Sequence, residues 1–418
     1  MSRRPLWGYL TAQAVSLTGT RVSMIAIPWF VLTTTGSATR TGLVAFAEMG
    51  PLVLMQVLSG PLIDRLGARR VAIGCDLASV AAVGLVPALH LTHLLSFGTL
   101  LALVAVAGSL RGPGDAAKHA LMPQVAEHTG ARMERVTGLD GAVERTASLV
   151  GAAAGAGLVS LLGAANALAL DAASFLVSAI VLAGSLPAVV RVAGRARTTA
   201  TDYLSDLRSG WSFLRRDAVL MGIGVMVAVT NLLDQAFTAV LLPVWARHSG
   251  YGVAAVGIFS ATFAGTAILG SVVAARYGDR LPRFKVYLVG FLLAGVPRFA
   301  VLALGAPLWL VLPVAVVGGV GCGFLNPILG AVMFERIPKP LLGRVSAMGL
   351  AMSWSLIPFG GLLGGVAVAG VGIAPALLAV GAAYFAATML PALRPSFRQM
   401  DRAGVPRSAE ARENVPAA

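Results

Sequence analysis

Residues 60–70 have the sequence Gly-Pro-Leu-Ile-Asp-Arg-Leu-Gly-Ala-Arg-Arg, and residues 279–283 have the sequence Asp-Arg-Leu-Pro-Arg. The shared tripeptide begins at Asp64 and again at Asp279, 215 residues later. The same offset relates three further pairs of residues: Pro28 and Pro243, Gly42 and Gly257, and Gly50 and Gly265. A charged tripeptide and a proline at one fixed spacing indicate that the second half of the chain repeats the first.

The composition excludes a soluble enzyme. Of 418 residues, 57% are hydrophobic and 12% are charged, whereas an average soluble domain is about half apolar and about a quarter charged. Intrinsic disorder is excluded too, because disordered chains have low hydrophobicity. We therefore expect an all-α integral membrane protein.

Twelve apolar runs are long enough to cross a bilayer, which takes about 20 residues each. They cover residues 7–33, 41–63, 71–91, 94–115, 138–162, 166–190, 218–246, 253–275, 286–304, 308–330, 345–370 and 374–393. The expected domains are a six-helix bundle over 1–190, a basic cytoplasmic linker with an amphipathic helix over 191–217, a second six-helix bundle over 218–393 and a disordered cytoplasmic tail over 394–418.

The positive charges give the expected orientation. The chain has a formal charge of +14 from 32 Lys and Arg residues against 18 Asp and Glu residues. Nearly all cations in the predicted loops lie on the side of the N-terminus, and only Arg40 and Arg247 lie in the opposite loops. The positive-inside rule then places both termini in the cytoplasm of a multi-pass protein of the cytoplasmic (inner) membrane. We interpret the excess as topology and attraction to anionic lipid, not as a nucleic-acid site.

The stretch from Gly60 to Arg70 resembles motif A of the major facilitator superfamily, Gly-x-Leu-Ala-Asp-Arg-x-Gly-Arg-Arg, and departs from it at Ile63 and Ala68. The resemblance implies two six-helix bundles related by a pseudo-twofold axis along the membrane normal, with a small-molecule substrate bound between them. It also implies a gating role for motif A and its degenerate second copy. The expected gating residues are Gly60, Asp64, Arg65, Gly67, Arg69, Arg70, Asp279 and Arg280. The alternative is a basic loop that serves only topology.

Three shorter stretches resemble the branch of enterobactin-type siderophore exporters and macrolide efflux pumps: residues 27–32, 118–123 and 206–216. Two features depart from that branch and from the antiporter motif: Thr20 replaces an acid, and residues 151–155 lack a proline. The resemblance implies a secondary active transporter with proton-coupled efflux of a small amphipathic compound such as a drug, antibiotic or siderophore-like metabolite. The alternatives are an uptake symporter of the same fold, a non-transporting receptor or scaffold, and a membrane-embedded enzyme.

Ionisable residues inside membrane helices are costly and are therefore functional candidates. On helices that line the cavity of the superfamily, the candidates for substrate or proton coupling are Arg21, Glu48, Asn231 and Asp234. A direct pair between Arg21 and Asp234 is conceivable from their similar depth. Asp76, Glu144 and Arg145 form a possible secondary charge network near the cytoplasmic edge. For Asp171 and Arg298 we expect structural pairing.

Glycines with small-x-x-x-small spacing predict close helix packing on helices five and eleven. They are Gly151, Gly155, Gly360, Gly361, Gly364 and Gly365. In a rocking transporter these helices would slide against partners across the interface between the halves, although static packing explains the spacing equally well.

Other chemistries have no support in the sequence. The three lysines do not follow a Gly-x-x-x-x-Gly pattern, which excludes a P-loop. No His-Glu-x-x-His or Gly-x-Ser-x-Gly pattern is present, and Cys75 and Cys322 both lie within apolar runs. We expect no enzyme activity, cofactor or metal, and a monomer whose partners are the substrate, protons and membrane lipid.

Overall fold

The computed structural model describes residues 3–186, 208, 210–277, 281–338, 341–394 and 397. Within these residues the secondary structure is helical, and twelve helical spans are long and apolar enough to cross a membrane. This confirms the expected all-α membrane fold and the number of spans. The expected linker helix and the tail lie largely outside the described residues, although residues 210–216 are helical.

The first half contains six uninterrupted helices, and each begins close to its predicted position. Their bounds are α1 Arg4–Thr35, α2 Ala38–Leu66, α3 Ala68–Leu91, α4 Phe97–Thr129, α5 Met133–Leu162 and α6 Ala164–Ser185. Helix α1 packs against α5 and α6, and α4 packs against α2 and α3.

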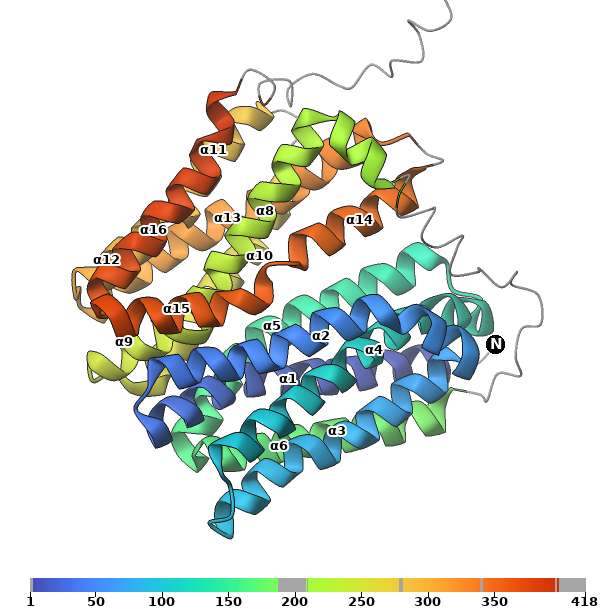
Figure 1. Cartoon of the computed structure of the whole chain (residues 1–418). Coiled ribbons are helices and arrows are strands. Elements are labelled where there is room, and N and C mark those ends of the chain that lie inside the picture. Colours follow the sequence, from blue (N-terminus) through green and yellow to red (C-terminus); the bar gives the residue numbers. More distant parts are fainter. Residues whose placement is uncertain are drawn as a thin grey trace, which may run out of the picture.

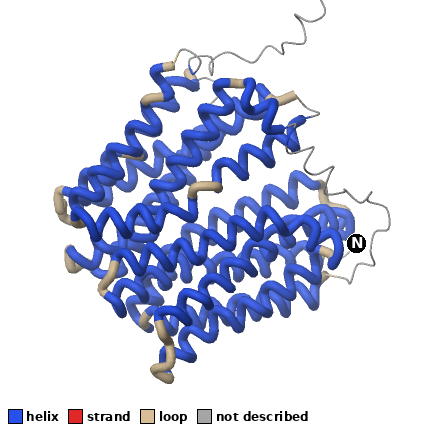
Figure 2. The backbone as a smooth tube through the Cα atoms, in the orientation of Figure 1, coloured by secondary structure: helices blue, strands red, loops and turns tan. Residues whose placement is uncertain are grey.

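The second half has the same number of spans, but three of them are interrupted. The elements are α8 Ala218–Ala236, the π-helical segment η1 Phe237–Leu241, α9 Leu242–His248, α10 Gly252–Tyr277, α11 Arg283–Ala294, α12 Val296–Ala303, α13 Leu308–Arg336, α14 Leu342–Trp354, α15 Ile357–Val371, α16 Ile373–Met389 and the 3₁₀ turn η4 Pro391–Leu393. Figure 2 shows the break between α14 and α15 as a short non-helical segment in the middle of the molecule.

Helix α4 differs from its prediction. The expected span ended at residue 115, yet the helix continues through Gly112-Pro113-Gly114 to Thr129. Gly108 and Gly112 lie against the backbone of α2, where a Cβ would fall on the carbonyl oxygens of Glu48 and Leu52. The close crossing of α2 and α4 thus uses these glycines within the helix, and tertiary packing outweighs their low helix propensity.

The two halves meet along two helix pairs, α2 with α15 and α5 with α10. We call the side of the molecule that carries Arg3 and the α2–α3 turn the N-terminal side, and the side of the α1–α2 turn the far side. Figure 1 shows the halves close together on the far side and diverging toward the N-terminal side. The contacts on the far side agree with this view, because Gly42 of α2 lies against Gly361 of α15, and Gly257 of α10 lies against Ala156 of α5.

Candidate functional site

The most prominent charged group of the second half is an ion pair between Asp234 on α8 and Arg298 on α12. Nη2 of Arg298 donates to Oδ1 of Asp234. The Arg298 side chain is 7% exposed, whereas that of Asp234 is 38% exposed. The pair therefore has one buried partner and one partner that faces open space.

Aromatic rings surround the guanidinium of Arg298. Its Cζ atom lies 4.8 Å from the ring centroids of Phe237 and Phe299, 5.0 Å from that of Tyr384 and 5.8 Å from that of Phe263. Cation–π attraction is strongest where water is excluded. The rings therefore hold the guanidinium in place independently of Asp234.

Two of the three helix interruptions lie beside this pair. The π-helical segment η1 begins at Phe237, three residues after Asp234, and π-bulges often mark functional sites. The break between α11 and α12 is at Gly295, three residues before Arg298. A Cβ at Gly295 would lie 2.7 Å from Cδ1 of Tyr384, so only glycine lets the chain pass this ring. The irregular backbone thus positions both charges.

A cavity of about 250 Å³ opens next to the pair, and we call it the Asp234 cavity. Its walls come from five spans and are mostly aromatic or apolar. Besides Asp234 and Arg298 it is lined by Phe237, Thr238, Leu242, Phe259, Ser260, Phe263, Ala294, Cys322 and Tyr384. The segment η1 also packs on α1 and α2, so this cavity lies near the boundary with the first half.

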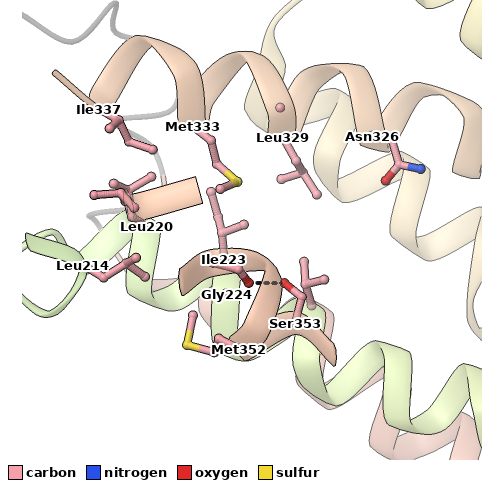
Figure 3. A pocket seen from close by; sticks show the side chains of 14 residues that line it. Leu214, Leu220, Ile223, Gly224, Asn326, Leu329, Met333, Ile337, Met352 and Ser353 are labelled. Atoms are coloured by element: carbon pink, nitrogen blue, oxygen red, sulfur yellow. Dashed lines mark hydrogen bonds between the residues drawn. The ribbon is translucent and has the colours of Figure 1, made fainter. Parts of the chain in front are cut away.

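A second cavity, of about 240 Å³, lies between α8, α13 and α14. We call it the Met352 cavity, and Figure 3 shows Met333 and Met352 at its walls with Asn326 and Ser353 among the few polar side chains. Nearby, Asn231 donates through Nδ2 to the backbone oxygen of Ser353 at 2.9 Å, so this predicted site residue ties α8 to the end of α14.

In the first half, Glu48 is buried and pairs with Arg111 of α4 at 3.4 Å. Nε of Arg111 lies 3.7 Å from Asp115.

Arg21 is close enough to Arg111, Asp115 and Glu144 to interact electrostatically. Within the described residues, its side chain makes one weak hydrogen bond, from Nη1 to the sulfur of Met24 at 3.5 Å, and its buried Nε has no partner. The structure thus pairs Asp234 with Arg298, not with Arg21.

A buried network links four helices of the first half. Nζ of Lys118 on α4 lies 2.9 Å from Asp76 of α3 and donates to Ser16 of α1 at 2.8 Å. Ser178 of α6 donates to the other oxygen of Asp76 at 2.7 Å. The Lys118 and Asp76 residues are 2% and 3% exposed.

The predicted secondary network of Asp76, Glu144 and Arg145 is therefore not assembled. Asp76 pairs with Lys118, while Glu144 and Arg145 are exposed on α5.

Asp171 is buried as expected, but its partners are the hydroxyls of Ser23 and Ser174, not a cation. Three charged residues of α4 were not among the predicted site residues: Arg111, Asp115 and Lys118. The first two lie at the end of the predicted span over 94–115, and Lys118 lies beyond it. Their spacing on one continuous helix could have revealed them, since residues four and seven apart share a face.

Motif A forms the turn between α2 and α3. Gly67 has φ +87° and ψ 138°, a conformation that residues with a side chain rarely adopt. Nη2 of Arg69 donates to the backbone oxygen of Ala183 at 2.7 Å and so binds the end of α6. Four other residues of motif A are exposed: Gly60, Asp64, Arg65 and Arg70. Within the described part of the chain, Asp64 makes no hydrogen bond or ion pair. Asp279 and Arg280 lie outside the described residues.

The predicted packing glycines divide into two groups. Gly361 and Gly365 lie against Gly42 and Ala38 of α2, across the boundary between the halves. The other four pack within one half: Gly151 and Gly155 against α1, and Gly360 and Gly364 against α8 and η1. Only the first group therefore lies on a surface that would slide when the halves move.

At the N-terminal side of the second half, Arg283 donates twice to the carboxylate of Glu335, at 2.6 and 2.7 Å. These hydrogen bonds lower the pKa of Glu335 below its usual value. Both side chains are partly exposed, so the pair contributes little to stability. Among the described residues, no group of three or more His, Cys, Asp or Glu residues is arranged to hold a metal ion.

The sequence matches the family model described as Major Facilitator Superfamily over residues 9–233 and 224–414. Among curated proteins, it is 28% identical over 408 residues to "Multidrug efflux pump Tap" of Mycobacterium tuberculosis, covering 96% of each chain. It is 27% identical over 417 residues to the protein of the same name from Mycolicibacterium fortuitum, covering 97% of this chain and 99% of the relative.

Solved structures share the fold at low sequence identity. The nucleoside transporter NupG gives a TM-score of 0.70 at 16% identity, covering 96% of this chain and 100% of that one. A bacterial homologue of the iron transporter ferroportin, in an inward-facing state, gives 0.68 at 13% identity with the same coverage of both chains. These likenesses concern the fold alone.

Proposed function

Because the chain belongs to the Major Facilitator Superfamily, we propose that it is a proton-coupled exporter of small amphipathic compounds in the cytoplasmic membrane, with both termini in the cytoplasm. The relatives named multidrug efflux pump support export over uptake. The basic loops on the N-terminal side support the orientation. With this orientation, the divergence of the halves in Figure 1 corresponds to an inward-facing state.

The observation that carries the proton coupling is the environment of Asp234. It is an acid inside a membrane span, it borders a cavity at the boundary of the halves, and its cationic partner is held separately by aromatic rings. Protonation would release the carboxyl from Arg298 without freeing the arginine. A carboxyl that changes between a wet and a dry environment exchanges its proton as the halves rock. Glu48, paired with Arg111, is the corresponding candidate of the first half.

The remaining predicted residues take supporting roles in this proposal. Arg21 has no carboxylate within ion-pair distance among the described residues, so it is available to a substrate group or to an acid in the outward-facing state. Asn231 fixes the end of α14. Asp64 and the motif A turn act as a latch that closes only when the N-terminal sides of the halves meet, consistent with the exposure of Asp64 in this state.

Everted membrane vesicles with an acidic lumen test the coupling. For an antiporter we expect lumenal accumulation of a compound added outside, together with loss of the pH gradient reported by a fluorescent weak base. The Asp234→Asn variant should lose gradient-driven accumulation but keep exchange of compound without a gradient. Glu127→Gln changes an exposed acid on α4 and should behave as the wild type.

Two results would contradict the proposal. Undiminished accumulation by Asp234→Asn vesicles would remove Asp234 as the proton carrier. Movement of compound together with protons out of the lumen would identify an uptake symporter instead of an exporter.

A further inference from the structure

The Asp234 cavity has unused hydrogen-bonding capacity of both kinds. Within the described residues, the only side-chain hydrogen bond of Asp234 joins its Oδ1 to Arg298, so Oδ2 is unbonded. Nη2 is likewise the only nitrogen of Arg298 with a hydrogen bond, and its buried Nε has no partner among the described residues. A guanidinium has five N–H donors. Nη1 also makes no hydrogen bond among these residues, and Arg298 lines the cavity, so this nitrogen is free to donate to a ligand there.

The charges around the cavity favour a ligand without net charge. Asp234 and Arg298 are its only charged lining residues, and together they are neutral. A permanent cation would enter beside a 7% exposed arginine, and a permanent anion would enter beside Asp234. Either would add an uncompensated charge in a poorly solvated site, which is costly. A neutral group with a donor and an acceptor instead adds hydrogen bonds to both partners of the pair.

The size and walls of the cavity favour a flat ring system. Phe237, Phe259, Phe263 and Tyr384 supply ring faces, and aromatic pairs are favourable in stacked or edge-on arrangements. At about 250 Å³ the cavity is smaller than sites for drug-sized ligands, which span roughly 300 to 1,000 Å³. It therefore suits a compound, or part of one, with one or two fused rings.

The exposed wall of the cavity faces the other half of the molecule. Thr238 and Asp234 are its more exposed lining residues, and Thr238 belongs to η1, which packs on α1 and α2 of the other half. The mouth thus lies at the boundary between the halves. Because four rings hold Arg298, a ligand can engage the pair without displacing the arginine.

We propose that the Asp234 cavity binds net-neutral, planar aromatic compounds that carry a hydrogen-bond donor next to an acceptor, and that it discriminates against permanent cations and anions of the same shape. The term substrate for such compounds rests on the function proposed above. The binding itself does not depend on proton coupling.

Three quinoline probes of matched size test the proposal by calorimetric titration of the purified full-length protein in detergent. Quinoline-2-carboxamide is neutral and has a donor and an acceptor, N-methylquinolinium is a permanent cation, and quinoline-2-carboxylate is an anion at neutral pH. We expect the amide to bind about tenfold or more tightly than either ion, as the loss of one charge-assisted hydrogen bond implies. Equal or tighter binding of an ion, or no binding of the amide, would overturn the proposal.

Two further measurements locate the bound amide. Thr238→Trp fills the mouth of the cavity and should abolish binding, whereas Val225→Trp, at an exposed position of α8 that lines neither cavity, should not. In a Cys75→Ser background, the amide should slow alkylation of Cys322, which lines the cavity. Binding that persists in Thr238→Trp and leaves Cys322 unprotected would place the ligand elsewhere and overturn the assignment.

The outcomes separate this inference from the proposed function. Amide binding with unimpaired gradient-driven accumulation by Asp234→Asn would retain the ligand class and reject Asp234 as proton carrier. Gradient-driven accumulation that Asp234→Asn loses, combined with preferential binding of N-methylquinolinium, would retain Asp234 as proton carrier and reject the ligand class.

Discussion

Lys118 holds the first half together through a buried ion pair. Its ammonium contacts Asp76 and Ser16, and it is 2% exposed. Removing one partner of such a pair leaves an uncompensated charge and costs about 3–5 kcal/mol, while removing both is often neutral. We predict that Lys118→Met strongly lowers the thermal unfolding temperature in detergent and that Asp76→Asn combined with Lys118→Met restores much of it. Arg145→Met, at an exposed position, is the control; equal effects of the two single variants would contradict the assignment.

The sequence could predict that charged residues inside spans matter, but not how they pair. Asp234 and Glu48 stand out by type and position alone. Their partners Arg298 and Arg111 are 64 and 63 residues away in the chain, and such contacts depend on how helices pack. Lys118 was missed for a local reason: Gly112-Pro113-Gly114 has the composition of a helix end, so the predicted span stopped at residue 115, with Arg111 close to its edge. In the structure Gly112 lies at the crossing of α4 with α2, and Gly114 lies against Cys75 of α3.

Among the elements, α15 packs closely against α2 of the other half. A Cβ at Gly361 would lie 2.7 Å from Cβ of Ala45 and 2.9 Å from the oxygen of Gly42, so a larger side chain must separate α2 from α15. We predict that Gly361→Val destabilises the protein by about 1–3 kcal/mol, the usual cost of overpacking, measured by thermal unfolding. Gly370→Val is the matched control on the same helix, because a Cβ there meets no atom within 4 Å. A similar loss in both variants would mean that helix propensity, not packing, is responsible.

The number of elements was predictable, while their interruptions were only partly so. Each span is a long apolar run bounded by charges or turn residues, and that pattern follows directly from the bilayer thickness. The break before α12 has a signal in Gly295-Val296-Pro297, and the break before α15 has one in Pro358. The π-helical segment from Phe237 to Leu241 is an ordinary apolar stretch. Its local signal is Pro243, which follows the segment at the start of α9 and has no N–H for the helical hydrogen-bond ladder.

At the scale of the whole molecule, the repeat and the contact between the halves are connected. Leu32 and Arg247 are separated by 215 residues, the offset of the repeat, and Arg247 donates through Nη1 to the backbone oxygen of Leu32. The two residues occupy equivalent places at the ends of α1 and α9, so their contact lies near the axis that relates the halves. The carbonyl groups of a helix end attract a cation. The attraction explains why Arg247 lies on the far side, where the sequence has few positive charges.

Arg247 should therefore favour the state in which the halves are closed on the far side. Removing its charge-assisted hydrogen bond by Arg247→Gln costs that state about 1.5 kcal/mol, or about a tenfold change in the ratio of the two states. Spin labels at Leu66→Cys on α2 and Tyr277→Cys on α10, both exposed on the N-terminal side, report the change in a background without native cysteines. We predict a larger population of short distances between the two labels, since the N-terminal sides approach as the far side opens.

Arg40→Gln is the matched control, because that cation contacts Phe97 within the first half. An unchanged distance distribution in Arg247→Gln would show that close packing of α2 with α15 alone keeps the far side closed.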